Sequence, residues 1–351
     1  MSKALIYGCY GYTGRLIVEE AQQQGLPVVL SGRNADKVRA MGEEFGMEVA
    51  PVGLEDAAAL DAVLENVGVV VHCAGPFVRT FEAMAAACLR TGTHYLDITG
   101  EIAVFEGLAA MDEEAKANGV MLLPGVGFDV VPTDCVAAAL KAALPDATWL
   151  DLAFKSVGAN MSHGTATTMI QSLGESSFVR RKGQIVPVPV GKHTVEADFG
   201  RGGEIASGIP WGDVSTAYHS TRIPNITTYT VVGKRARRFL GLAPVFGPLL
   251  RSKTVRNMVQ KRIDKAPTGP DAATRGKAIS LVWGRARNAA GEERRLRLKT
   301  LNGYTLTALG GVYCAREVLA GRFQPGFQTP SNAYGHHLIQ QLDPNATFKN
   351  C

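Results

Sequence analysis

The sequence lacks the features that mark a metalloprotein, a disulfide-stabilised secreted protein or a membrane-spanning protein. Its six cysteines include no C-x-x-C pair, and no cysteine and histidine cluster has the spacing of metal ligands. No apolar run reaches the roughly 20 residues that a transmembrane helix needs. The apolar pattern of a strand begins by residue 3, which leaves no room for a signal peptide. We therefore expect a cytoplasmic protein with reduced thiols and no metal.

The chain has only a small net charge, and one segment of the sequence accounts for its positive sign. The 351 residues carry a net charge of +5, yet residues 234–262 hold nine Lys/Arg and no Asp/Glu, so the remainder is net −4. Within this segment lies the apolar run 239–250, which two prolines interrupt and which is too short to span a bilayer. Peripheral membrane contact, a substrate tunnel, a dimer interface and a solvated basic face all remain open. No nucleic-acid-binding motif accompanies the charge, so we expect no nucleic-acid partner.

The chain itself opens on a motif typical of nucleotide binding. A short apolar strand runs into Gly8, Gly11 and Gly14, and a helical pattern follows at once. A glycine turn between a strand and a helix aims backbone N–H groups and the positive helix end at one point, which suits a phosphate. Because a second strand follows at 27–30, we expect a dinucleotide site. The residues that form this turn are Gly8, Tyr10, Gly11, Tyr12, Thr13 and Gly14.

The end of the second strand indicates which dinucleotide binds. An NAD site usually has an acidic residue here for the ribose hydroxyls, and this chain has none. It has Ser31, Arg33 and Asn34, with Lys37 one turn further on. A guanidinium can make paired, charge-assisted hydrogen bonds to the 2′-phosphate of NADP. We therefore expect NADP, with NAD the less favoured cofactor.

Alternating strand and helix patterns continue to residue 130 and predict a Rossmann-type, doubly wound parallel sheet. Residues 67–74 form a nearly unbroken apolar run that is typical of a buried parallel strand. Ligands of such sheets lie beyond the carboxyl ends of the strands, so the turns there should border the cofactor. These turns contain Ala74, Gly75, Pro76, Phe77, Thr99, Gly100 and Glu101.

After this first domain the pattern changes. Alternating apolar residues at 148–157, 185–199, 226–233, 278–284 and 294–301 predict a mostly antiparallel sheet. One helix is expected inside this region, around 165–173. We therefore predict an NADP-binding Rossmann domain at 1–130, an inserted α+β domain for substrate binding or dimerisation at 131–304, and C-terminal helices at 305–351. We also expect one helix at 103–118, a loop at 325–330, and a last helix at 331–342 with Ser331 as its N-cap.

Several of these motifs together resemble the saccharopine dehydrogenase-like oxidoreductases, in particular the branch of the trans-acting enoyl reductases. The shared pieces are the glycine turn, the Gly75-Pro76-Phe77 turn, residues 92–101 with Thr99-Gly100-Glu101, Gly127-Phe128-Asp129, and Thr329-Pro330. They occur in the expected order over nearly the full length. The resemblance implies a Rossmann domain, an inserted domain, C-terminal helices that return to the first domain, and a nicotinamide cofactor. It does not imply saccharopine as the substrate.

Reduction of a C=O or C=N group needs a proton source near the acceptor atom. None of the nine tyrosines has lysine four residues later, which disfavours the Tyr-x-x-x-Lys mechanism of short-chain dehydrogenases. The candidates for catalysis are Asp97 at a strand end and His163 in the second domain. Phe128 and Asp129 are candidates for the substrate pocket.

The expected function is that of an NADP-dependent reductase, acting by hydride transfer on a hydrophobic acyl, enoyl or carbonyl-type small molecule. We expect it to be a homodimer. The alternative is a non-catalytic Rossmann-fold binding or sensing protein at a membrane surface, which the lack of an evident acid–base pair leaves open.

Overall fold

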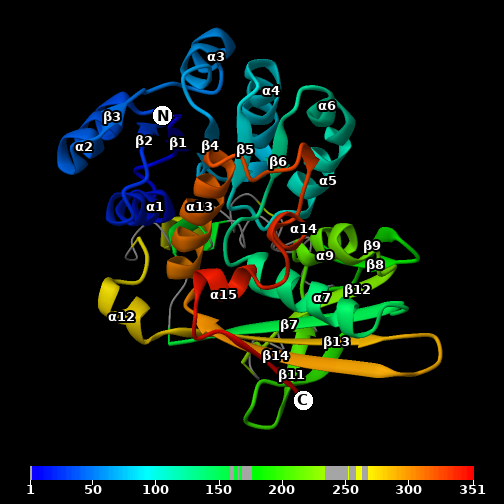
Figure 1. Ribbon diagram of the computed structural model, residues 1–351. Coiled ribbons are helices and arrows are strands. Elements are labelled where there is room, and N and C mark those ends of the chain that lie inside the picture. The colour runs from blue at the N-terminus through cyan, green and yellow to red at the C-terminus, as the bar shows by residue number, and fades with distance from the viewer. Residues whose placement is uncertain are drawn as a thin grey trace. The chain divides into compact units, whose positions relative to one another are not determined.

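The computed structural model describes residues 2–158, 162–164, 166–167, 176–233, 252, 258–262 and 268–351 (Figure 1). The chain forms two compact units. Unit 1 comprises Met1–Val131 and Gly303–Leu342, and unit 2 comprises Pro132–Asn302 and Asp343–Cys351. The sequence predicted crossings between domains after residues 130 and 304. The C-terminal segment 305–351 was predicted to return to the first domain as a whole, but residues 343–351 belong to unit 2.

Unit 1 is built on a seven-stranded sheet in the order β15-β6-β5-β4-β1-β2-β3, and all its pairings are parallel. Strand β1 pairs with β2 on one side and with β4 on the other, so the strand order reverses at β1. The predicted parallel sheet is confirmed. The strands are β1 (Ala4–Tyr7), β2 (Val28–Ser31), β3 (Glu48–Val49), β4 (Val69–His72), β5 (His94–Asp97), β6 (Met121–Leu123) and β15 (Gly326–Phe327).

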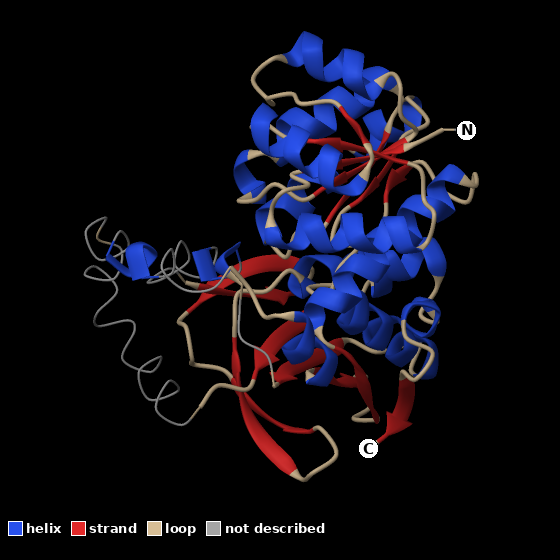
Figure 2. Cartoon of the chain, turned by 90° about the vertical axis from the view of Figure 1, so that its left-hand side faces the viewer, coloured by secondary structure: helices blue, strands red, loops and turns tan. Residues whose placement is uncertain are grey.

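Helices cover both faces of this sheet, as Figure 2 shows. Alternate residues of each strand point to opposite faces, so Ile6 and Leu5 enter different hydrophobic cores. The core with Ile6 contains α1 (Tyr12–Gln23), α2 (Ala35–Phe45) and α13 (Gly303–Leu319). The core with Leu5 contains α3 (Ala57–Leu64), α4 (Phe81–Thr91), α5 (Ile102–Ala110) and α6 (Asp112–Ala117).

Three predictions in unit 1 were wrong in detail. A single helix was expected at 103–118, but the chain breaks at Met111 between α5 and α6. Residues 325–330 were expected to be a loop, and two of them form β15. A last helix from Ser331 to Leu342 was also expected. It is instead two short helices, α14 (Pro330–Tyr334) and α15 (Leu338–Leu342), and Thr329 rather than Ser331 caps the first.

Unit 2 contains a mixed sheet whose main path runs β10-β11-β12-β7-β13-β14-β16, with β8 and β9 attached beside β12. All its pairings are antiparallel except that of β12 with β7. This agrees with the predicted mostly antiparallel sheet. The strands are β7 (Trp149–Val157), β8 (Ser177–Arg181), β9 (Gln184–Val188), β10 (Thr194–Asp198), β11 (Gly203–Gly208), β12 (Asn225–Thr230), β13 (Ile279–Arg287), β14 (Glu293–Leu301) and β16 (Thr347–Asn350).

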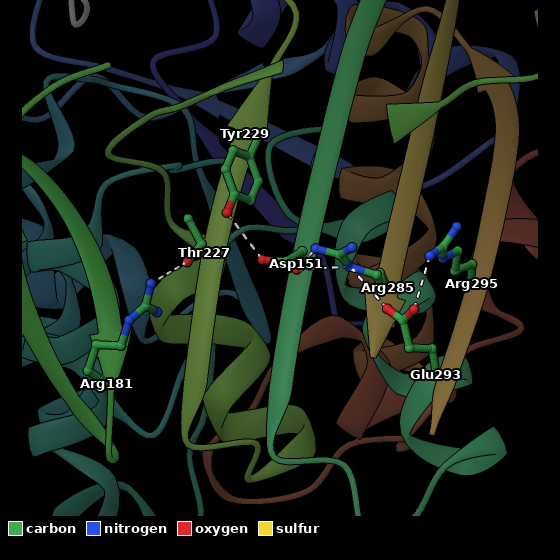
Figure 3. Close-up of polar contacts among 7 residues, drawn as sticks. All are labelled: Asp151, Arg181, Thr227, Tyr229, Arg285, Glu293 and Arg295. Atoms are coloured by element: carbon green, nitrogen blue, oxygen red, sulfur yellow. Dashed lines mark hydrogen bonds and ion pairs between the residues drawn. The ribbon is translucent and has the colours of Figure 1, made fainter. Parts of the chain in front are cut away.

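The two faces of this sheet differ. Gly284 of β13 lets α7 (Val131–Ala143) approach one face, because a Cβ at this position would lie within 3.0 Å of Val136 and Leu140. The opposite face carries a small apolar core around Trp283 and Tyr229, and beyond it a network of charged side chains (Figure 3). Helices α9 (Asp213–Thr221) and α12 (Ala272–Lys277) complete the described part of this unit.

Some elements of the structure were missed by the sequence pattern, and some predicted segments lie mostly outside the described residues. The pattern did not reveal β8, β11, α9 or β16. Most of the helix expected at 165–173 and most of the basic segment 234–262 lie outside the described residues. Among the described residues no helix is both long enough and apolar enough to cross a bilayer.

Candidate cofactor and active site

The glycine turn at the end of β1 is held by close backbone approaches. Gly8 has a φ of +84°, and a Cβ there would lie 3.0 Å from Ala74. A Cβ on Gly14 would come closer than 3.0 Å to the carbonyl oxygen of Gly8, so a side chain would force helix α1 away from β1. Gly11 has an ordinary φ of −71°, and a Cβ there would meet only the Gly8 oxygen at 3.3 Å. Gly8 and Gly14 thus shape the turn, and Gly11 faces open space.

The N-terminus of α1 has no side-chain cap, unlike those of α2 and α3. The first N–H groups of any helix lack partners within the helix, and an anion can satisfy them. The open side of Gly11 leads to these groups, and Tyr12 and Thr13 lie in this first turn. The residues of the turn therefore fit a dinucleotide phosphate, which would lie against Gly11 and the N-terminus of α1.

The end of β2 presents its basic side chains to solvent. Arg33 and Lys37 are exposed, and the Lys37 Nζ lies 5.6 Å from the centre of the Tyr10 ring. The Asn34 side chain caps α2 by accepting a hydrogen bond from the Lys37 N–H at 3.0 Å. The buried Ser31 hydroxyl donates to the Ala50 carbonyl at 2.6 Å. Arg33 and Lys37 are therefore the groups free to meet a 2′-phosphate, while Asn34 and Ser31 hold local structure.

Glu101 clamps the turn that follows β4. Its carboxylate accepts hydrogen bonds from the N–H groups of Phe77 at 2.9 Å and Val78 at 3.0 Å. The peptide bond between Gly75 and Pro76 in this turn is cis. Thr99 accepts the Glu101 N–H at 3.0 Å and so fixes the clamp. The two turns that the sequence proposed as cofactor neighbours are thus tied to each other.

His72 lies fully buried beneath the same turn. Its Nε2 is 2.9 Å from the Thr80 hydroxyl, and that hydroxyl donates to the Ala74 carbonyl at 2.9 Å. The hydroxyl therefore accepts from a protonated Nε2, which leaves Nδ1 as the unprotonated nitrogen. Burial lowers the pKa of His72 to about 3, so the ring stays neutral. This histidine supports the turn from inside the protein.

Asp97 joins the ends of β5 and β6. Its Oδ1 accepts the N–H groups of Thr99 at 2.9 Å and Gly125 at 2.8 Å, and its Oδ2 accepts the Tyr95 hydroxyl at 2.7 Å. Burial raises its pKa to about 6, and these hydrogen bonds oppose part of the shift. The side chain is fully buried, and its hydrogen bonds hold the loops that follow β5 and β6 in position. A catalytic role for Asp97 stays a prediction.

Asp129 lies in the loop after β6, next to the turn that Asp97 and Glu101 hold in place. Its Oδ2 lies 3.0 Å from the position that a Cβ on Gly100 would take, so the carboxyl group packs directly against the Thr99-Gly100-Glu101 turn. The residue as a whole is partly exposed, but burial of its carboxyl group raises the pKa to about 7. A carboxyl group with this pKa is substantially protonated at neutral pH and can donate a proton.

Phe128 is fixed by helix α13, which comes from the far end of the chain. Its N–H donates to the Thr307 hydroxyl at 3.0 Å, and its ring packs against Gly303. Thr307 also packs so closely on Gly127 that a Cβ there would not fit. Sequence reasoning missed this role of Thr307, because a threonine inside a helical pattern carries no signal of its distant partner. Phe128 thus forms a fixed wall beside Asp129.

The other catalytic candidate, His163, belongs to unit 2. Its backbone N–H donates a hydrogen bond to the Thr268 carbonyl at 3.0 Å. Its proposed role as a proton donor stays a prediction. All other proposed site residues lie at the carboxyl ends of β1, β2, β4, β5 and β6 in unit 1.

The comparisons with known proteins agree with this geometry. Residues 4–123 match the saccharopine dehydrogenase NADP-binding domain family. The predicted resemblance to the saccharopine dehydrogenase-like oxidoreductases is therefore confirmed.

Full-length similarity extends to relatives and to a solved structure. A Mycobacterium tuberculosis protein whose assignment as a trans-acting enoyl reductase is itself provisional is 27% identical, over 94% of this chain and 86% of its own length. The trans-acting enoyl reductase of Mycobacterium leprae is 30% identical over 37% of this chain and 33% of its own. Apo saccharopine dehydrogenase (L-Glu forming) from Saccharomyces cerevisiae shares the fold, with a TM-score of 0.70, 12% identity and full coverage of both chains. Together these similarities support an oxidoreductase.

Proposed function

We propose that the protein is an NADP-dependent reductase that transfers a hydride to a hydrophobic enoyl, acyl or carbonyl compound. The observation that carries the proposal is the uncapped N-terminus of α1 behind Gly11, bordered by the tied turns after β4, β5 and β6. The domain family adds support, since its members bind NADP. The substrate class rests on the apolar run 239–250 in the sequence and on the names of the mycobacterial relatives.

The nicotinamide group, when bound, supplies the hydride. The protein has to orient it, exclude water and provide a proton. Glu101 and Asp97 hold the turns after β4, β5 and β6 in fixed positions, and Phe128 offers an apolar wall. Asp129 then donates the proton to the reduced substrate, because its carboxyl group is the titratable group of this cluster that is both partly exposed and protonated near neutral pH.

The cofactor assignment is tested with Arg33→Gln. Titration of the purified protein with NADPH and with NADH should show tighter binding of NADPH. Loss of a charge-assisted contact should weaken NADPH binding about 10- to 100-fold and leave NADH binding unchanged. Arg39→Gln is the matched control, since Arg39 lies on α2, just after Arg33, but pairs with Asp36 at 3.2 Å. Failure of the protein to bind either nucleotide would contradict the proposal.

The reaction is tested by following NADPH oxidation with enoyl thioesters of increasing chain length. We expect turnover that rises with chain length and falls about 100-fold in Asp129→Asn, with NADPH affinity retained. Binding of NADPH without turnover of any enoyl, keto or imine compound would favour the non-catalytic alternative. Sedimentation of the same samples tests the proposed homodimer.

A further inference from the structure

A second cluster of polar and aromatic side chains lies in unit 2, far from the glycine turn in the sequence. Beside Trp149, at the start of β7, a shallow hollow of about 550 Å³ opens to solvent. Trp149 is 39% exposed, whereas Trp283 further along the same face is 2% exposed and belongs to the apolar core. The hollow is lined by Trp149, Arg285, Arg287, Asn288, Ala289, Gly291 and Glu293.

Two carboxylates on this face, those of Asp151 and Glu293, are already paired with arginine side chains. Asp151 accepts two hydrogen bonds from Arg285, at 3.1 Å and 2.8 Å, and one from the Tyr229 hydroxyl at 3.2 Å. Glu293 pairs with Arg295 at 3.0 Å and with Arg285 at 3.6 Å. Figure 3 shows these contacts as one chain across strands β12, β7, β13 and β14. The two negative charges are therefore balanced by Arg285 and Arg295.

Two further guanidinium groups have no such balance. Arg181 donates to two backbone carbonyls and to the Thr227 hydroxyl, which are all neutral. The Nε of Arg287 is buried and has no hydrogen-bond partner among the described residues. Both guanidinium groups lie by the ring of Trp149, at 5.2 Å for Arg181 and 5.8 Å for Arg287. Two guanidinium groups without a carboxylate partner among the described residues thus flank one exposed aromatic ring. The nearby carboxylates of Asp146 and Glu292 accept hydrogen bonds from the Asn288 amide instead.

We propose that Arg287, Arg181 and Trp149 form a second binding site, for a phosphate or carboxylate group attached to an apolar body. A guanidinium with unused donors favours a bidentate oxyanion, and burial of an unpaired Nε is unfavourable until such a partner is bound. The Trp149 ring offers an apolar surface beside the charge. This site is independent of the cofactor site proposed for unit 1.

Charge argues against a second copy of the same face as the occupant. This face presents the guanidinium groups of Arg181 and Arg287 around Trp149, so two such faces brought together repel each other. An oxyanion is complementary to this charge. A soluble phosphate ester and the headgroup of an anionic lipid carry the same chemistry, and the experiment separates these two sources.

The test follows tryptophan fluorescence of the full chain during titration with inorganic phosphate, with dihexanoyl phosphatidic acid, and with phosphatidic acid vesicles. We expect binding that Arg287→Gln weakens about 10-fold or more, and a signal that Trp149→Phe removes. Arg294→Gln is the matched control, because Arg294 is paired with Ala286 and so lies on the opposite face of the same two strands. It should bind like the unaltered protein.

The outcomes separate clearly. Binding of free phosphate indicates a soluble ligand, and binding of the lipid forms alone indicates a lipid headgroup; each supports the site if Arg287→Gln weakens it. No binding of any probe, equal loss in Arg294→Gln, or self-association that Arg287→Gln abolishes would overturn the proposal. NADPH affinity is measured in parallel and should be unchanged in every variant, so failure here is distinct from failure of the proposed reductase function.

Discussion

The two units use polar side chains in opposite ways. Unit 1 has 10 Lys/Arg and 19 Asp/Glu, a net charge of −9, whereas unit 2 is net +14. In unit 1 both faces of the parallel sheet are covered by helices, so polar groups can gather only where the strands end. In unit 2 a polar network lies on one face of the sheet, with Asp151 inside β7 and Arg285 inside β13 rather than beyond the strand ends. The layering of a sheet thus decides where its polar chemistry can lie.

The largest effect should come from breaking the glycine turn of unit 1. Gly14→Val should destabilise the protein by about 4 kcal/mol or more and abolish NADPH binding, since its side chain would overlap the Gly8 carbonyl. Urea unfolding and NADPH titration measure both. Gly11→Ala should keep stability within about 1 kcal/mol but lose NADPH affinity, because it blocks only the open side of the turn. Gly276→Ala in α12 of unit 2 has room around it and is the control for a neutral change.

The next effect concerns the sheet face of unit 2. Asp151→Ala should destabilise unit 2 by about 3 kcal/mol, because Arg285 and the Tyr229 hydroxyl lose their buried acceptor. Hydrogen exchange in β7 and β13 should rise while that of unit 1 stays unchanged. Glu293→Ala is the comparison, and its more exposed ion pairs predict less than about 1 kcal/mol. Equal effects of the two variants would show that the network does not depend on Asp151.

A smaller effect should appear in the pH dependence of unit 1. The pKa of Asp129 is about 7 in the folded protein and 3.8 for the ordinary side chain, so the folded state binds this proton more tightly. Its contribution to stability is full below about pH 4 and is lost at about 1.4 kcal/mol per pH unit as pH rises from about 4 to about 7. Asp129→Asn should flatten this part of the urea-derived stability profile. The buried Asp97, whose pKa is raised in the same direction, keeps a residual slope. An unchanged profile would contradict the assigned pKa.

The smallest effect distinguishes a helix cap from a cofactor contact. Asn34→Ala should lower stability by about 1 kcal/mol, because it removes the cap of α2. Asn34→Ser restores a capping hydroxyl and should regain most of that stability. NADPH affinity in the serine variant should equal that of the unaltered protein. A loss of affinity there would show that the Asn34 side chain also contacts the cofactor.

Local sequence determined much of unit 1. The glycine turn, the apolar strands and the polar strand ends carry their signal within a few residues, because strand, turn and helix propensities are local. The same reasoning located β7, β12, β13 and β14 approximately in unit 2. It missed β8, β11 and β16, whose short patterns are weak without their sheet partners, and it merged α5 and α6 into one helix.

What the tertiary structure alone decided is which side chains meet. Glu101 was predicted as a site residue from its place after a strand. Its hydrogen bond from the Phe77 N–H, however, depends on the pairing of β4 with β5. Thr307 and Phe128 are 179 residues apart, and no local pattern encodes such a contact. The pairing of Asp151 with Arg285 likewise requires the register of β7 on β13. The sequence by itself determined the elements and the type of cofactor turn, whereas these long-range contacts arose only when the strands aligned and the helices packed.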